Sequence, residues 1–253
     1  MGLRNLLYRA YERRITAHLP AERVPRHVGV MLDGNRRWAR QKGADTAHGH
    51  RAGADNIVPL LTWNEELGVE IVTLWLLSTD NLKRPPEELT QLLVIIENVV
   101  SELAGAQRWR VNIVGAQGLL PEETTRALAA AAESTRDVEG LVVNIAVGYG
   151  GREEIADAVR ALLRRAEREG RTLHDVAENL DVEDIAENLY TYGQPDPDLV
   201  IRTSGEQRIG GFLLWQSTHS EFYFCEAYWP DFRRVDFLRA LRAFAERERR
   251  FGG

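Results

Sequence analysis

The sequence predicts an α/β domain built on a mostly parallel sheet that is flanked by helices. Three observations support this fold class. Short runs rich in Val, Ile and Leu alternate with longer stretches of helical periodicity from residue 27 onwards. The runs do not alternate with polar residues, so both faces of each strand are expected to be buried. No repeat, linker or change of composition divides residues 27–253, which we therefore assign to one domain.

The segment 1–26 predicts a basic, amphipathic helix that ends near Pro20. Apolar side chains recur there every four residues, at Leu3, Leu7, Tyr11, Ile15 and Leu19. Six arginines and two glutamates give this arm a net charge of +4, against −6 for the whole chain. One interpretation is packing on its own domain or on a partner subunit. The alternative is peripheral contact with an anionic membrane surface at the inner face of the cell membrane.

The remaining elements follow in order. Five apolar runs predict strands, at residues 27–32, 70–77, 110–115, 141–147 and 198–203, and the runs 212–215 and 221–224 add a further short strand. Helices are expected at about 50–67, 86–104, 121–136, 151–169, 181–190 and 234–250. The second and third of these helices begin with proline followed by acidic residues, which favours a helix start.

Composition excludes several classes of protein. The chain of 253 residues can bury a core without disulfides, and its single cysteine, Cys225, permits neither an intrachain disulfide nor a cysteine-cluster zinc site. No apolar run has the length of a membrane span, and the N-terminus lacks the signal-peptide pattern. The acidic net charge argues against a general nucleic-acid binder. We therefore expect a cytoplasmic protein that binds no nucleic acid.

Polar residues follow four of the predicted strands, at 33–38, 78–85, 148–152 and 202–208. In open α/β sheets, ligands bind beyond the carboxyl ends of the strands. Gly34 lets backbone N–H groups point at an anion, and Arg37 can add charged hydrogen bonds to phosphate oxygens. Asp33 cannot bind phosphate directly, but it suits a Mg²⁺ ion that bridges to phosphate. The alternative is that Asp33 only caps a helix.

Three further groups fit an anion site. His50 stands at the start of a helical pattern, where it either donates to a phosphate oxygen or has no role. Arg202 and Arg208 flank a turn and suit a second diphosphate. Glu221 lies in an apolar run, so its carboxylate must be paired with a cation or bound to a metal. The sequence holds no P-loop and no Asp-Asp-x-x-Asp motif, and its GYGGRE segment matches dinucleotide loops only weakly.

These residues stand in strings that resemble the cis-prenyltransferase family, also known as Z-isoprenyl or undecaprenyl diphosphate synthases. The resemblance implies a homodimeric α/β enzyme that condenses an allylic diphosphate with isopentenyl diphosphate and uses Mg²⁺. The strings occur in the family's order from about residue 26 to the C-terminal arginines, as HVGVMLDGNRRWAR, GHRAG, LSTDNLKRP, NIAVGYGGREEI, DLVIRTSGEQR and FLLWQSTHSEFYF.

The resemblance also implies roles for individual residues. Asp33 matches the essential residue linked to Mg²⁺, and Glu221 belongs with the metal site. The residues that match the allylic diphosphate site are Gly34, Asn35, Arg37 and His50, and those that match the isopentenyl diphosphate site are Arg202 and Arg208. Ser78, Asn81 and Arg84 match a loop that closes during turnover. Substrate binding is also expected of Arg36, Trp38, Thr79, Leu82 and Gly210. The base that removes the final proton stays open between Asn81, acting through water, and the diphosphate itself.

Some positions depart from the family's usual pattern. Thr46 and Leu82 replace an arginine and a tryptophan that are common there, and Gly210 replaces a serine. We interpret these departures as marks of a subgroup. The run Arg247-Glu248-Arg249-Arg250 predicts a solvated helix end or, by resemblance, a tail that reaches the partner's substrate.

Leu76 and Leu77 predict the length of the product. Long-chain members have Ala-Phe-Ser where this chain has Leu76-Leu77-Ser78, and a bulky wall blocks a growing chain because close-packed interiors do not yield. The pattern resembles actinobacterial short-chain enzymes, so we predict Z,E-farnesyl diphosphate made from geranyl diphosphate. The alternatives are a C50–C55 synthase, a non-catalytic prenyltransferase subunit and an enzyme that couples two allylic diphosphates.

Overall fold

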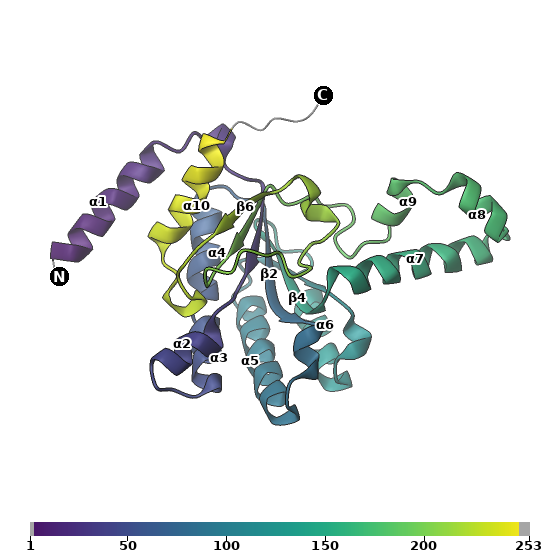
Figure 1. Cartoon of the computed structure of the whole chain (residues 1–253), viewed down its shortest axis with the longest axis horizontal. Helices are drawn as coiled ribbons and strands as arrows, with labels where there is room; N and C mark the ends of the chain where they lie inside the picture. The colour runs from purple at the N-terminus through teal and green to yellow at the C-terminus, as the bar shows by residue number, and fades with distance from the viewer. Residues whose placement is uncertain (1–2, 248–253) are drawn as a thin grey trace.

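A six-stranded sheet forms the centre of the computed structural model, which describes residues 3–247 (Figure 1). The strand order is β3-β4-β2-β1-β5-β6, and every neighbouring pair is parallel. The fold class predicted from the sequence is thus confirmed. The strands are β1 (His27–Met31), β2 (Ile71–Ser78), β3 (Arg110–Val114), β4 (Val142–Tyr149), β5 (Leu199–Arg202) and β6 (Glu221–Phe224).

Helices connect the strands. Six of the longer ones are α1 (Leu3–Ala17), α4 (Ile57–Glu66), α5 (Pro86–Gly105), α6 (Glu122–Ser134), α7 (Gly151–Arg168) and α10 (Arg234–Glu246). The others are α2 (Asn35–Gln41), α3 (Thr46–Ala54), α8 (Leu173–Asn179) and α9 (Val182–Ala186), with single 3-10 turns η1 (Ala21–Arg23), η2 (Asp80–Lys83), η3 (Gln117–Leu119), η4 (Gln216–His219) and η5 (Trp229–Asp231). Proline stands in the first turn of α5, as expected.

The core lies on both sides of the sheet, because alternate side chains of one strand point to opposite faces. Val28 and Val30 of β1 belong to the main core, into which helices α4, α5 and α10 pack. Met31 belongs to a smaller cluster on the other face, where Phe212 is fully buried. All five residues of β1 are buried, which explains the continuous apolar run in the sequence.

Three predicted elements differ from the structure. Residues 212–215 form turns and not a strand, because Gly210, Gly211 and Leu213 have positive φ angles. The predicted helix 50–67 is two helices, α3 and α4, which separate at Asn56, whose side chain donates to the carbonyl groups of Trp229 and Phe232. The predicted helix 181–190 is reduced to α9.

The position of β1 creates a crevice in the sheet. β1 pairs with β2 on one side and with β5 on the other, so the chain winds outward from β1 in both directions. In open parallel sheets a ligand crevice forms at such a switch point, beyond the carboxyl ends of the strands. The ends of β1 and β5, at Met31 and Arg202, are therefore brought together.

The N-terminal helix α1 packs along α10 (Figure 1). The hydroxyl of Tyr8 accepts a hydrogen bond from Arg233 at 3.2 Å, and that of Tyr11 accepts one from Arg242 at 3.3 Å. Ile15 is buried. Packing on its own domain, one of the two interpretations, therefore holds for this part of the helix. Of the run 247–250, only Arg247 lies within the described residues. Among residues 3–247, no helix combines the length and the apolar character needed to cross a membrane.

Candidate active site

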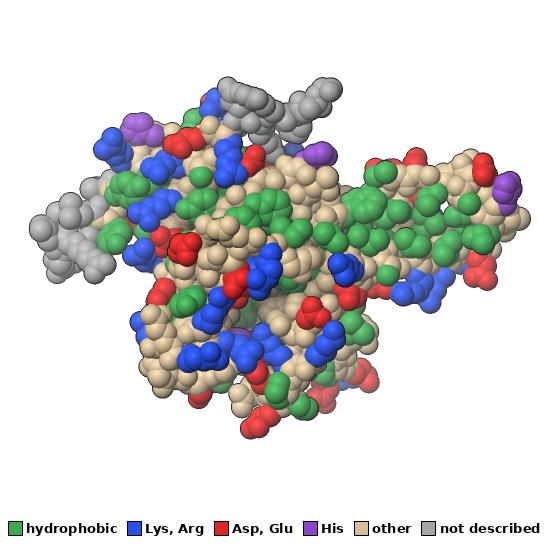
Figure 2. All heavy atoms as spheres, viewed as in Figure 1, with side chains coloured by type: hydrophobic (Ala, Val, Ile, Leu, Met, Phe, Trp, Pro, Cys, Tyr) green, Lys and Arg blue, Asp and Glu red, His purple; other side chains and the backbone are tan. Residues whose placement is uncertain are grey.

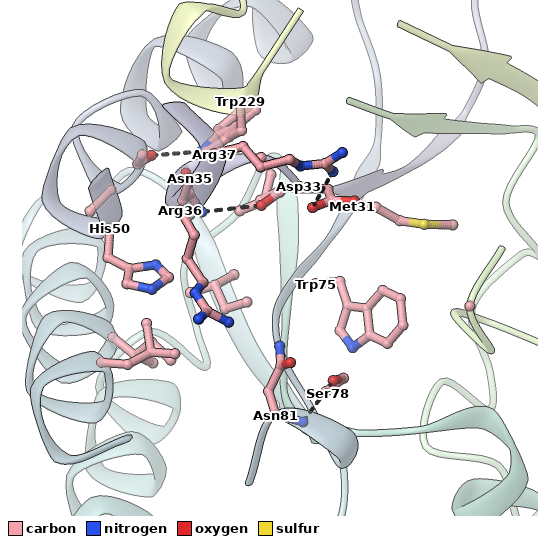
Figure 3. A pocket seen from close by; sticks show the side chains of 18 of the residues that line it. Met31, Asp33, Asn35, Arg36, Arg37, His50, Trp75, Ser78, Asn81 and Trp229 are labelled. Carbon is pink, nitrogen blue, oxygen red and sulfur yellow. Dashed lines mark hydrogen bonds and ion pairs between the residues drawn. The ribbon is translucent and has the colours of Figure 1, made fainter. Parts of the chain in front are cut away.

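A cavity of about 680 Å³ lies beyond the carboxyl ends of β1, β2 and β5. Figure 2 shows Lys and Arg side chains gathered around a hollow near α2, α3 and α5, and Figure 3 shows the cavity from close by. Most of the predicted site residues line it: Asp33, Gly34, Asn35, Arg36, Arg37, His50, Leu76, Ser78, Asn81, Arg84, Arg202, Arg208 and Gly210.

Asp33 is held in place through its backbone. Its N–H donates to the hydroxyl of Thr203 at 2.9 Å, and that hydroxyl lies 2.7 Å from the carbonyl oxygen of Asp33. The next residue, Gly34, has a φ of 110°, and a Cβ there would lie 2.7 Å from the ring of Tyr228. Glycine is therefore required for the turn from β1 into α2. The carboxylate of Asp33 is left facing the cavity (Figure 3).

Two arginines converge on the Asp33 carboxylate. Nη2 of Arg202 lies 2.8 Å from Oδ2, and Nη2 of Arg37 lies 3.4 Å from Oδ1. Arg202 is only 8% exposed, and its Nε has no partner in the described part of the chain. Burial alone would raise the pKa of Asp33, but hydrogen bonds from Arg202 and Ser204 and the arginine charges lower the pKa overall. The carboxylate is therefore charged at neutral pH.

Glu206 is a second carboxylate that pairs with arginines of the site. Its carboxylate accepts from Arg37 at 2.9 Å and also pairs with Arg208. Ser204 accepts from Arg37 at 2.7 Å and has a φ of 80°, an unusual backbone conformation for a residue with a side chain. Backbone strain of this kind persists where the surrounding contacts enforce it, often at functional sites.

On the α5 side, Glu88 pairs with two arginines that reach it from different elements. Arg36 of α2 lies 3.6 Å away, and Arg84, which follows η2, lies 3.2 Å away. Arg84 also lies 3.5 Å from Nε2 of His50. Burial, together with the charge of Arg84, lowers the pKa of His50 to about 4. The imidazole is therefore neutral at physiological pH and can either donate or accept a hydrogen bond.

Two glycines of the GHRAG string let α3 approach α2 closely. A Cβ at Gly49 would lie 2.3 Å from the carbonyl oxygen of Asn35, and a Cβ at Gly53 would lie 2.3 Å from its side-chain oxygen. That side-chain oxygen is buried and has no hydrogen-bond partner among residues 3–247. The string therefore fixes Asn35 and His50 beside the cavity.

The other end of the cavity is apolar. Helix α5 contributes a row of side chains at helical spacing, and α3, α4 and β2 complete the wall, through Leu92, Ile95, Ile96, Val99, Ala54, Ile57 and Leu76. The loop between β2 and α5 borders the opening, where the hydroxyl of Ser78 accepts from the N–H of Asn81 at 3.1 Å. A charged end and an apolar end thus share one cavity.

Several predicted residues do not line the cavity. Trp38 stacks on His48, with ring centroids 5.7 Å apart. Leu82 packs against the main core, and Leu77 is fully buried within it, so neither forms a wall of the cavity. The hydroxyl of Thr79 faces Gly150. These four side chains thus stand outside the cavity wall, and their predicted roles in substrate binding or product length stay predictions.

Two further expectations need correction. The segment 148–152, which begins within the end of β4, does not line the cavity; the N–H of Gly151 donates to the carbonyl of Gly211 at 2.9 Å, so the segment supports the neighbouring loop. Glu221 opens β6 and therefore lies at the amino end of the sheet, opposite to Asp33. It pairs with Arg247. Pairing with a cation, one of the two alternatives for Glu221, is what the structure shows, and a metal site shared with Asp33 within one chain is not formed.

Three carboxylates line the cavity, those of Asp33, Asp80 and Glu206; Glu206 is paired with Arg37 and Arg208, and Asp80 with Lys83. In the described part of the chain, no three His, Cys, Asp or Glu side chains cluster as metal ligands would. Mg²⁺, however, often takes only one or two carboxylates and completes its shell with phosphate oxygens and waters. Asp33, which is charged and faces the cavity, fits that donor set.

Among the polar and aromatic residues that line the cavity, sequence reasoning missed Arg40, Trp75, Asp80, Glu206 and Trp229, and it missed Glu88 beside it. The acidic residues escaped because a carboxylate is not expected among anion-binding arginines. The helical spacing of Arg36 and Arg40 could have indicated Arg40, since residues four apart share a helix face.

Comparisons with known proteins identify related sequences and a related structure. The sequence model of a prenyltransferase family described as "Putative undecaprenyl diphosphate synthase" matches residues 31–252. A (2Z,6E)-farnesyl diphosphate synthase from Thermobifida fusca is 61% identical over 100% of both chains. An enzyme of the same name from Mycobacterium tuberculosis is 54% identical, over 99% of this chain and 97% of that protein.

Similarity extends to a further relative and to a crystal structure. Isoprenyl transferase 1 from Streptomyces avermitilis is 58% identical over 99% of this chain and 98% of its own length. The crystal structure of lavandulyl diphosphate synthase from Lavandula x intermedia, in complex with dimethylallyl diphosphate, superposes with a TM-score of 0.85 at 34% identity. The match covers 92% of this chain and 100% of that one.

Proposed function

Because this chain belongs to the cis-prenyltransferase family of undecaprenyl diphosphate synthases, we propose that it condenses isopentenyl diphosphate with an allylic diphosphate to give a short product. The substrate that fits best is geranyl diphosphate, and the product is then (2Z,6E)-farnesyl diphosphate, for which two relatives at 54–61% identity are named. The observation that carries this proposal is the single cavity with an arginine-lined end and an apolar end.

The reaction breaks the C–O bond of the allylic diphosphate, forms one C–C bond, and releases inorganic diphosphate and a proton. Negative charge develops on the leaving diphosphate, so fixed cations that face it stabilise the transition state. Arg36, Arg37 and His50 supply donors to that group, and Arg202 and Arg208 hold the diphosphate of isopentenyl diphosphate. The loop with Ser78, Asn81 and Arg84 excludes water, which would otherwise capture the allylic cation.

Mg²⁺ is part of this proposal. Asp33 would hold the ion, and the ion would neutralise charge on the leaving diphosphate. Asp33 also orients Arg202 through its 2.8 Å ion pair, so the carboxylate positions a cation with or without the metal. Asn81 is the candidate that assists proton removal, since its side chain lines the cavity near the opening.

We also propose that the chain acts as a homodimer. Helices α7, α8 and α9 form an arm that projects from the sheet, and the face of the arm seen in Figure 2 carries hydrophobic side chains. Leu173 and Val182 are 76% and 69% exposed. The arm's own core consists of only three buried residues, Leu162, Ala166 and Val176. Light scattering after chromatography should give the mass of a dimer, and Val182→Asp should shift it toward the monomer.

For the N-terminal helix, packing on its own domain is the role that its contacts with α10 favour. Contact with an anionic membrane is the alternative, because Arg13 and Arg14 are exposed. Sedimentation with vesicles of anionic phospholipid separates the two interpretations: if the protein stays in the supernatant, packing is the role of the helix. A cytoplasmic location stays a prediction.

The proposed function is tested by incubating the purified protein with Mg²⁺, isopentenyl diphosphate and C5, C10 or C15 allylic diphosphates, and chromatographing the dephosphorylated products. We expect Z,E-farnesol from the C10 substrate. Products of C50–C55 would support a long-chain synthase instead, and absence of any product would support a non-catalytic subunit. Dimethylallyl diphosphate alone tests the coupling of two allylic diphosphates.

A further inference from the structure

Two consecutive side chains of β2, Trp75 and Leu76, line the cavity. In a regular strand, successive side chains point to opposite faces of the sheet. The pairing of β2 with β4 is irregular here: Trp75 lies opposite Ala146 and Leu77 lies opposite Val147, which leaves Leu76 without a partner. A β-bulge of this kind redirects side chains and commonly lies next to an active site. Trp75, which precedes the irregularity, packs with the smaller core cluster, and Leu76, which lies within it, packs with the main core, so the cavity reaches both faces of β2.

The indole of Trp75 is held in one orientation before any ligand binds. Its Nε1 donates to the carbonyl of Tyr149 at 3.3 Å. Its ring stacks on Phe212, with centroids 5.1 Å apart and an interplanar angle of 12°, and it meets the ring of Tyr149 edge-on at 6.4 Å. Both Phe212 and Tyr149 are fully buried. A side chain fixed in this way loses little conformational entropy when a ligand packs against it.

The distal end of the indole lies at the charged end of the cavity. A Cβ on Gly210 would lie 3.5 Å from the Cη2 and Cζ3 atoms of Trp75 and 3.8 Å from Nη1 of Arg202. Leu76, by contrast, packs against the main core toward the apolar end. The two neighbouring side chains thus serve different ends of one cavity, and Trp75 stands next to the arginine pair Arg202 and Arg208.

We propose that Trp75 determines specificity for the hydrocarbon part of the second substrate, an inference that rests on the proposed condensation. While Arg202 and Arg208 hold the diphosphate of isopentenyl diphosphate, the indole is the apolar surface on which its five-carbon group lies. The indole lies within van der Waals reach of Gly210, beside the guanidinium of Arg202. The flat, fixed ring favours a short branched homoallylic chain and disfavours a bulkier one.

The inference is tested with Trp75→Leu and the conservative Trp75→Phe, which keeps an aromatic ring against Phe212. Trp63→Leu is the matched control, because Trp63 stacks on Phe237 away from the cavity. Steady-state KM values are measured separately for isopentenyl and geranyl diphosphate. Calorimetry measures binding of isopentenyl diphosphate and of inorganic pyrophosphate to each protein.

We expect Trp75→Leu to raise the KM for isopentenyl diphosphate about tenfold, equivalent to about 1.4 kcal/mol, with less than a twofold change for geranyl diphosphate. Binding of inorganic pyrophosphate should not change. Trp75→Phe should lie between this variant and the wild type, and Trp63→Leu should lower only the melting temperature. For a homologue of isopentenyl diphosphate with one additional methyl group, kcat/KM relative to that of the natural substrate should be higher in Trp75→Leu than in the wild type.

Equal rises in both KM values, or weaker pyrophosphate binding, would assign Trp75 a purely structural role and overturn the inference, as would an unchanged KM for isopentenyl diphosphate. If Trp75→Leu does not fold, Trp75→Phe takes its place and should raise the same KM by a smaller factor. If the wild type forms no product, the proposed function fails, whereas the two binding measurements still decide the role of Trp75.

Discussion

Truncation of Leu76 should lengthen the product. Burial of one further five-carbon unit contributes at most about 4 kcal/mol, at roughly 0.8 kcal/mol per carbon. Leu76 lines the cavity and packs toward α5, so a longer chain must overlap it, and overpacking costs about 1–3 kcal/mol. Leu76→Ala removes three carbons from this wall. If the longer chain gains even a third of the free energy of burying one more five-carbon unit, about 1.4 kcal/mol, the ratio of elongation to product release rises about tenfold.

The assay is chromatography of dephosphorylated, radiolabelled products from geranyl and isopentenyl diphosphate. We expect products of C20 and longer to increase at least tenfold relative to C15 in Leu76→Ala. Leu77→Val is the matched control, since Leu77 is the next residue but is fully buried outside the cavity. It should lower stability by about 1 kcal/mol and leave product length unchanged. The reasoning is refuted if folded Leu76→Ala gives the wild-type product ratio, or if the wild type already makes C50–C55 chains.

Three other perturbations have defined outcomes. Gly53→Ala places a Cβ 2.3 Å from the side-chain oxygen of Asn35, so thermal denaturation should show a loss of about 1–3 kcal/mol together with lower activity; wild-type stability would contradict the close approach. His50, whose pKa is lowered to about 4, binds a proton in the unfolded chain before it does so in the folded one, so stability should fall as pH drops from about 6.5 to 4. This fall should be shallower in His50→Gln, and parallel curves would exclude His50 as its cause. Asp33→Asn should lower kcat by about 10²–10³ with little change in KM, since an amide oxygen can still accept the hydrogen bond from Arg202; full turnover would refute the role of the carboxylate.

The fold was largely predictable because its strands are buried on both faces. The buried run at β1, for example, is continuous in the sequence and ends within one residue of the predicted boundary. The apolar run 212–215 was wrongly predicted as a strand because Phe212 and Leu213 are fully buried, although they belong to turns. Apolar periodicity reports burial and does not distinguish a buried turn from a buried strand. The break at Asn56 depends on carbonyl groups more than 170 residues away, which no local pattern reveals.

The site was predictable where its residues follow strand ends, as Asp33 and Arg202 do. Glu221 was left between a cation partner and a metal, because a local sequence does not reveal at which end of the sheet a strand begins. Glu88 and Glu206 were missed because their role depends on the arginines that they hold, and these come from other elements. Trp75 was missed because it lies in the continuous apolar run of β2, where the sequence does not distinguish a core side chain from one that lines a cavity.

The central position of β1 has a consequence for synthesis of the protein. The Asp33 carboxylate and the Arg202 guanidinium are 169 residues apart in the chain, so the ribosome has released most of the polypeptide before the two can meet. Until β5 is made, one edge of β1 stays open, and an apolar strand with an unpaired edge is prone to pair with other chains. We therefore expect nascent chains that stop before residue 199 to aggregate or to require chaperones. The pairing of β5 with β1 covers the open edge and also brings Arg202 to Asp33. The active site and protection from aggregation are therefore acquired in the same late step of folding.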